Sequence, residues 1–150
     1  MYKSILLFIA FVFTSYASSA QYLYPEKFNG CVLGFGLDLG TPKAKMPDNF
    51  TEQLVKNLDG TALTTIDGFI EVQVLIDTLG RPCLLSANNK TNIKSKALKL
   101  QAAINNTSVW EPAIYYGTKT DVCVMLLLEF KNEKLSVQRI KFDPANIKNK

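Results

Sequence analysis

Residues 68–130 constrain the fold more than any other part of the chain. Hydrophobic and polar residues alternate through 70–76, which is the period of a strand with one buried face. Residues 78–80 (Thr-Leu-Gly) then predict a turn into a second strand over 81–87. Farther along, 122–128 is hydrophobic on both faces, so this strand needs a cover on each side. The segment therefore predicts an antiparallel sheet whose two faces are both covered.

Two helices are predicted, one before the sheet segment and one inside it. Hydrophobic residues at four-residue spacing predict a helix over about 50–58, with Asp48 or Asn49 as its cap. A second helix is predicted over 93–104, with Asn92 as its cap. The solvent side of this second helix carries lysines, at positions 90, 94, 96 and 99. Such a run of lysines is usually a solvated face, although it could also approach an acidic partner.

The second helix should end at residues 109–112 (Val-Trp-Glu-Pro), because a proline pushes the residue before it toward extended geometry. Trp110 is the only tryptophan, and large aromatic side chains are most often wedged between a helix and a sheet. We therefore expect Trp110 and Pro112 to be structural anchors. Farther on, 131–134 predicts a hairpin turn into a strand over 135–142, which could pair back onto the strand before it.

The first twenty residues differ from the rest of the chain. A lysine near the start, an apolar run over 5–13 and small residues up to Ala20 have the layout of a secretory signal peptide. If the segment is instead retained, it would act as an inner-membrane anchor. We expect four parts: a signal peptide at 1–20, an irregular lead-in at 21–47, a folded domain at 48–142 and a flexible tail at 143–150.

Composition argues against several classes of function. The chain has no histidine, the commonest proton shuttle and metal ligand, and its acids are scattered over expected caps and turns. We expect no enzymatic activity, no metal and no cofactor. The formal net charge of +4 comes mostly from lysine and is too small to indicate nucleic-acid binding. Three cysteines allow one intramolecular disulfide, but their spacing does not say which two pair.

The expected fold is α+β: a small antiparallel sheet with two helices packed on one face, after an irregular N-terminal lead-in. Four segments carry a family resemblance: GFIEVQVLIDTLGRP, KALKLQAAI, VWEPA and DVCVMLLLEF. In this order they resemble the C-terminal domain of the TonB family, periplasmic proteins of Gram-negative bacteria that couple the inner membrane to outer-membrane receptors. The resemblance covers roughly residues 48–142.

The resemblance implies recognition by strand addition, in which an extended peptide pairs with an exposed sheet edge. The family's edge strand maps to residues 121–130, and the implied partner is a protein or extended peptide such as an outer-membrane receptor. The implied partner-binding residues are Asp121, Val122, Val124, Leu126, Leu128 and Phe130.

The leading interpretation is a stand-alone periplasmic module, because the chain lacks the family's long proline-rich spacer. The alternative is a minimal membrane-anchored energy transducer for receptor-mediated uptake. A third interpretation is an exported enzyme or small-ligand carrier.

Two further features of the sequence bear on the surface. The strand at 122–128, which is hydrophobic on both faces, could be covered by residues 22–46 or by a second copy of the protein, as in a homodimer.

Residues 77–79 (Asp-Thr-Leu) resemble the short acceptor motif of O-glycosylation in one bacterial phylum, and they also suit a hairpin turn.

Overall fold

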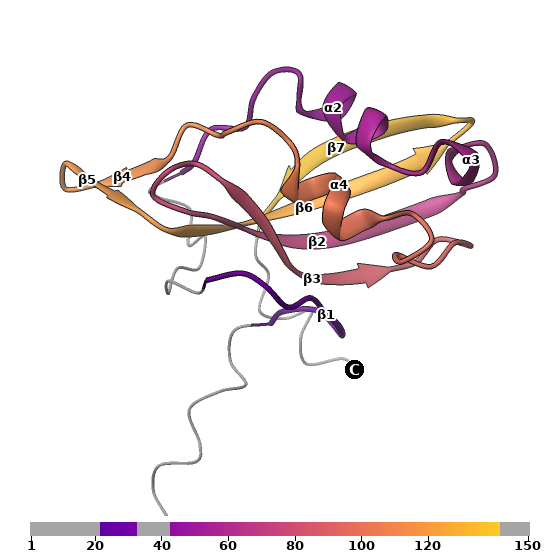
Figure 1. Ribbon diagram of the computed structural model, residues 1–150, viewed down its shortest axis with the longest axis horizontal. Coiled ribbons are helices and arrows are strands. Elements are labelled where there is room, and N and C mark those ends of the chain that lie inside the picture. Colours follow the sequence, from indigo (N-terminus) through magenta and orange to yellow (C-terminus); the bar gives the residue numbers. More distant parts are fainter. Residues whose placement is uncertain (1–21, 33–42, 142–150) are drawn as a thin grey trace, which may run out of the picture.

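The computed structural model describes residues 22–32 and 43–141, so the expected signal peptide and tail lie outside the described residues. The described part is an α+β fold in which short helices cover one face of a mostly antiparallel sheet (Figure 1). The strands are β1 (Glu26–Lys27), β2 (Gly68–Ile76), β3 (Pro82–Asn89), β4 (Ala113–Tyr115), β5 (Thr118–Thr120), β6 (Val122–Lys131) and β7 (Lys134–Ile140). The helices are α2 (Phe50–Asn57), α3 (Gly60–Leu63) and α4 (Leu100–Asn105).

The main sheet has the strand order β1-β3-β2-β6-β7, with every neighbouring pair antiparallel. The predicted hairpin at its centre is confirmed: β2 runs against β3 from Ile70 opposite Asn89 to Ile76 opposite Pro82. On its other side β2 pairs with the whole hydrophobic strand β6. A separate small hairpin of β4 and β5 projects from one end of the molecule (Figure 1).

The first helix is confirmed at Phe50–Asn57, but neither predicted cap residue caps it. The side chain of Asn49 makes no capping hydrogen bond; its Oδ1 instead accepts from Nε2 of Gln53. Asp59 opens the short helix α3, where its carboxylate accepts from the N–H groups of Thr61 and Ala62. The Ala62 N–H bond, assisted by Lys99, holds the pKa of Asp59 below its ordinary value.

The second helix is shorter than predicted, because α4 covers only Leu100–Asn105. Side chains earlier in the segment form hydrogen bonds to the backbone, one local and one long-range, that compete with a helix. Asn89 accepts from the N–H of Thr91, and Asn92 does not cap the helix but accepts from the N–H of Asp67. Residues 91–99 therefore form turns, and Lys99 enters α4 with a positive φ of 56°.

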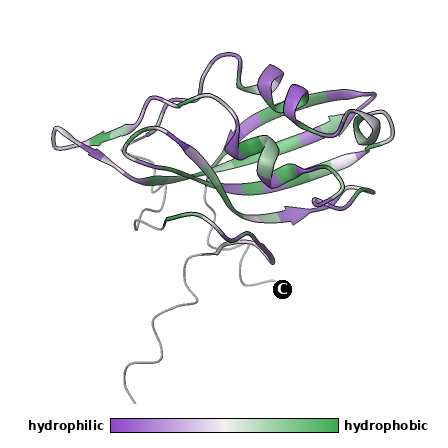
Figure 2. Cartoon of the chain, viewed as in Figure 1, coloured by the Kyte–Doolittle hydropathy of each residue, from purple (hydrophilic) through white to green (hydrophobic). Residues whose placement is uncertain are grey.

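The main core lies between the helices and the upper face of the sheet. Trp110 is 1% exposed, and its ring meets that of Phe50 edge-on at 5.4 Å between centroids. Leu54 of α2 and Ile104 of α4 are fully buried in the same cluster. Hydrophilic residues of α2 lie on the side away from the sheet (Figure 2). The expected anchoring role of Trp110 is confirmed; Pro112 is half-buried beside it.

The described part of the lead-in covers the opposite face of the sheet. This is the first of the two predicted alternatives, cover by residues 22–46 or by a second copy of the protein. Tyr22, Cys31 and Cys83 pack against a smaller cluster that contains Leu75 and Cys123. β1 pairs with the edge of β3, and a disulfide joins Cys31 to Cys83. Figure 1 shows this segment on the side away from the helices. The second face of the hydrophobic strand is therefore covered by residues of the same chain.

Polar groups under the lead-in are paired with each other. The N–H of Leu23 donates to Oε1 of Gln73 at 3.0 Å, and the hydroxyl of Ser86 donates to the same oxygen at 2.6 Å. Burial, together with the nearby charge of Glu71, raises the pKa of Tyr24 to about 12. These bonds hold an otherwise irregular segment in place, since buried polar atoms need partners.

Candidate functional site: the β7 edge

β7 is the longer of the two strands at the ends of the main sheet. In the described part of the chain it pairs with β6 on one side and has no strand on the other. The opposite end is closed by β1, which is only two residues long. An end strand leaves a row of backbone N–H and C=O groups available for pairing. β7 is therefore the end strand of the described sheet with the longer row of such groups.

The geometry of the β6–β7 turn identifies which backbone groups face outward. Asn132 and Glu133 have φ values of 53° and 60°, as a two-residue type I′ turn requires. In such a hairpin the pair that closes the turn, Lys131 and Lys134, exchanges two backbone hydrogen bonds. Each following pair along the strands is then alternately not hydrogen-bonded and hydrogen-bonded, and the backbone groups of a β7 residue in a non-hydrogen-bonded pair point away from β6. The outward groups at the start of β7 therefore belong to alternate residues: Leu135 and Val137.

A small hollow with only about 20 Å³ of free space lies next to this edge. It is bounded by α2, α3 and the β6–β7 turn, and its hydrophobic lining comes from Val55, Leu63, Ile66, Phe130 and Leu135. Val55 points from α2 with 40% of its surface exposed. A peptide paired with the start of β7 would pass this hollow, whose apolar lining could contact one of its side chains.

The charges around the edge are mainly positive. Lys131, Lys134 and Lys141 are exposed, and the exposed acids closest to them in sequence are Glu129 in β6 and Glu133 in the turn. Lysines on an edge strand discourage indiscriminate pairing with other sheets. The same lysines favour an extended segment that carries acidic residues.

The strand that the family resemblance implied as the binding edge is an interior strand, which corrects that expectation. β6 pairs with β2 along its length and with β7 from Met125 to Lys131. Its implied partner-binding side chains are in the core or near it: Val122, Val124, Leu126, Leu128 and Phe130 are all buried. Asp121, just before β6, accepts from the N–H of Thr78 at 2.9 Å.

β6 is an interior strand because the strand predicted over 135–142 is formed, as β7, and pairs with it. Its pairing with β6 is confirmed from Leu135 opposite Phe130 to Ile140 opposite Met125. β7 thus occupies the edge that β6 would otherwise present, and the exposed edge moves outward by one strand. Polar and hydrophobic residues alternate at the start of β7, and Lys134, Ser136 and Gln138 are exposed. This alternation is the sequence signal for a strand with one solvent-facing side.

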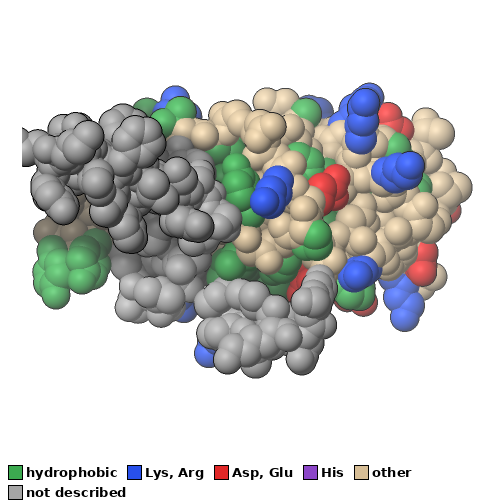
Figure 3. All heavy atoms as spheres, turned by 90° about the horizontal axis from the view of Figure 1, so that it is seen from below, with side chains coloured by type: hydrophobic (Ala, Val, Ile, Leu, Met, Phe, Trp, Pro, Cys, Tyr) green, Lys and Arg blue, Asp and Glu red, His purple; other side chains and the backbone are tan. Residues whose placement is uncertain are grey.

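The β4–β5 hairpin forms a second exposed surface. Tyr116 at its tip is 90% exposed, and its ring contacts that of Tyr115 edge-on. Hydrophobic side chains gather at this end of the molecule in Figure 3, whereas Lys and Arg are spread singly over the rest of that face. The scattered arrangement fits a solvated surface better than a basic patch.

Neither a metal-ion cluster nor a membrane-spanning helix is formed by the residues that the structure describes. Within 22–32 and 43–141, no group of three or more Cys, Asp and Glu side chains is placed to hold a metal ion. Over the same ranges, no helix has the length and hydrophobicity of a membrane span.

Comparison of the chain with protein-family models, with curated proteins and with solved structures gave no match.

Proposed function

We propose that the protein is an exported binding module that recognises an extended peptide by adding it to β7 as a further strand. The observation that carries this proposal is the one-sided pairing of β7 beside an open apolar hollow. Main-chain hydrogen bonds to the edge supply affinity, and a side-chain hollow supplies selectivity.

The chemistry of the edge favours a particular class of peptide. The hollow offers an apolar contact surface at Val55, Leu63 and Leu135, with room for about one water-sized group. Lys131 and Lys134, at its rim, favour acidic residues on either side of that apolar position. The preferred ligand is therefore an extended segment with one small apolar residue between acids.

The expected setting of this activity follows the TonB resemblance. The N-terminal twenty residues support export to the periplasm, where the periplasmic segment of an outer-membrane receptor is the proposed partner. An exported module needs to bind such a segment only transiently, for which a single added strand is suited.

Selection of peptides from a displayed random library, followed by substitution of Val137, tests the proposal. Val137→Pro removes an outward N–H without removing a ladder bond to β6, and proline is tolerated on that side of an edge strand. Val137→Ala is the matched control, because it trims the same side chain and keeps the N–H. We expect Val137→Pro to weaken binding of the selected peptide about tenfold or more, and Val137→Ala to leave it nearly unchanged.

Two results would contradict the proposal. One is a selected peptide that binds both variants equally well. The other is a library that yields no peptide at all for the intact protein. Gln138→Pro calibrates the experiment, because the N–H of Gln138 belongs to the β6–β7 ladder and its loss should lower the melting temperature.

A further inference from the structure

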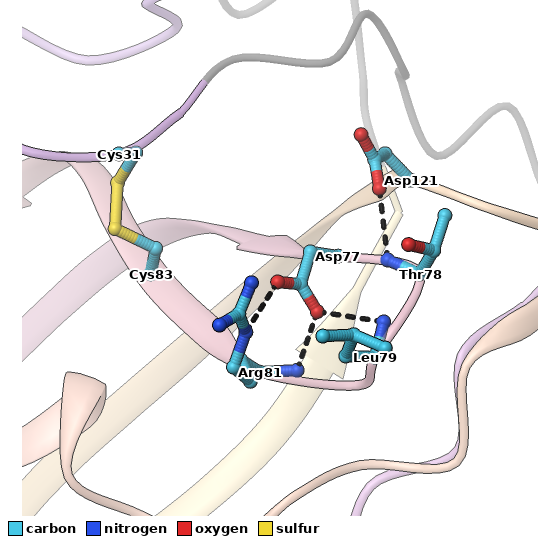
Figure 4. Close-up of polar contacts among 7 residues, drawn as sticks. All are labelled: Cys31, Asp77, Thr78, Leu79, Arg81, Cys83 and Asp121. Atoms are coloured by element: carbon cyan, nitrogen blue, oxygen red, sulfur yellow. Dashed lines mark hydrogen bonds and ion pairs between the residues drawn. A yellow bond between two sulfur atoms is a disulfide. The ribbon is translucent and has the colours of Figure 1, made fainter.

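The turn between β2 and β3 is held rigidly by hydrogen bonds to two aspartates (Figure 4). One oxygen of Asp77 accepts from the N–H groups of Leu79 and Arg81, each at 2.9 Å. Its other oxygen pairs with Nε of Arg81 at 2.6 Å. Asp121 accepts from the N–H of Thr78 at 2.9 Å. The backbone of residues 77–81 is therefore fixed from both sides.

Gly80 attaches the same turn to the loop that contains Trp110 (residues 109–112). It has a positive φ of 80°, and a Cβ at this position would lie 2.0 Å from the carbonyl oxygen of Trp110. In return, the N–H of Trp110 donates to the carbonyl of Gly80 at 2.8 Å. The fold thus requires an acceptor at Asp77 and a glycine at Gly80.

The fold does not require the side chains of Thr78 and Leu79, which lie between Asp77 and Gly80. Thr78 is exposed, and its hydroxyl makes no hydrogen bond to any other described residue. Leu79 is 60% exposed on the same turn. Any polar residue would serve at either position, and an exposed leucine gains nothing from the core. A hydroxyl and an aliphatic side chain are therefore presented together at the surface, next to the carboxylate of Asp77, whose oxygens are already bonded within the turn.

We propose that Thr78 is an O-glycosylation acceptor. This is the only place in the chain where an aspartate precedes a serine or threonine, and Asp77-Thr78-Leu79 matches the acceptor pattern noted in the sequence. The rigid turn presents the hydroxyl to a separate transferase without any unfolding. The inference does not depend on strand addition at β7.

The transfer uses a sugar carried on a lipid diphosphate as the donor. Oγ1 of Thr78 attacks the anomeric carbon of that sugar. A glycosidic C–O bond forms while the bond from the same carbon to the phosphate oxygen breaks. The lipid diphosphate leaves with the bonding electrons, and the hydroxyl proton passes to a base on the transferase.

The chain also has four Asn-x-Ser/Thr sequences, the acceptor pattern of N-glycosylation, and two of them, at Asn89 and Asn105, are less well placed for modification. Oδ1 of Asn105 accepts from the N–H of Leu84 at 2.8 Å, and the side-chain amide of Asn89 donates to Ser95 and to the carbonyl of Ile93. Their amides therefore take part in the folded structure, unlike the hydroxyl of Thr78.

Mass spectrometry of the protein isolated from its native host tests the proposal. We expect the proteolytic peptide containing residues 77–79 to carry a mass increase of one or more sugar residues, located on Thr78 by electron-transfer dissociation. Thr78→Ser should keep the modification and Thr78→Val should lose it completely. Thr118→Val, which removes another exposed hydroxyl, should leave it unchanged.

Thr78→Val keeps the backbone N–H that Asp121 accepts, so an unchanged melting temperature will show that the variant is folded. An intact mass equal to that of the unmodified polypeptide would overturn the inference. So would a sugar located on any other residue, or one that persists in Thr78→Val.

Discussion

Replacing both Cys31 and Cys83 by serine should lower the stability of the protein substantially. The bridge closes a loop between positions separated by 52 residues. The chain-entropy relation for a loop of about this length gives roughly 4 kcal/mol at 25 °C. Measured effects usually fall below this relation, because the unfolded chain retains structure. We expect the free energy of unfolding to decrease by about 2–4 kcal/mol.

Urea denaturation of the double variant and of the oxidised parent, followed by circular dichroism, measures this difference. Reduction of the parent with dithiothreitol is the internal control and should reproduce the loss while exposing two additional thiols. A decrease of less than about 0.5 kcal/mol, within the range of an ordinary surface substitution, would refute the reasoning. It would mean that the lead-in is not tied to β3 in the folded protein.

Three further predictions follow from single residues. Gly80→Ala should cost roughly 2–3 kcal/mol of unfolding free energy in urea titrations, because it combines a positive φ with a clash against the carbonyl of Trp110. Trp110→Ala should cost about 3–5 kcal/mol by the same assay, since it empties the centre of the core. Ultraviolet titration should find Tyr24 ionising near pH 12. Because its folded pKa is raised, its contribution to stability is present below pH 10 and is lost as the pH rises toward 12; ionisation of Tyr24 together with tyrosines of ordinary pKa would contradict this account.

The central strands could be predicted because their signals are local. The alternation in β2 and the hydrophobic run in β6 each indicate a strand without reference to distant residues. The short length of α4 was not predictable from periodicity. The hydrophobic spacing over 93–104 suits a helix, but side-chain hydrogen bonds from Asn89 and Asn92 hold the first half of that segment in turns.

The disulfide pairing and the strand order could not be predicted from the sequence, for a different physical reason. The pairing of Cys31 with Cys83 depends on where the lead-in crosses the sheet, and no spacing rule encodes that path. The family resemblance places the binding edge on residues 121–130, and the sequence alone leaves open whether the next strand pairs with that edge. Once β7 pairs with β6, only β7 keeps outward backbone groups at that end of the sheet.

Amide hydrogen exchange by NMR, with and without a selected peptide, tests strand addition most directly. The outward N–H groups of Leu135 and Val137 should exchange quickly in the unliganded protein and become strongly protected when the peptide binds. The N–H of Gln138, which already belongs to the β6–β7 ladder, should change little. Protection confined to another surface, with Leu135 and Val137 still exchanging quickly in the complex, would contradict the assignment of β7 as the binding edge.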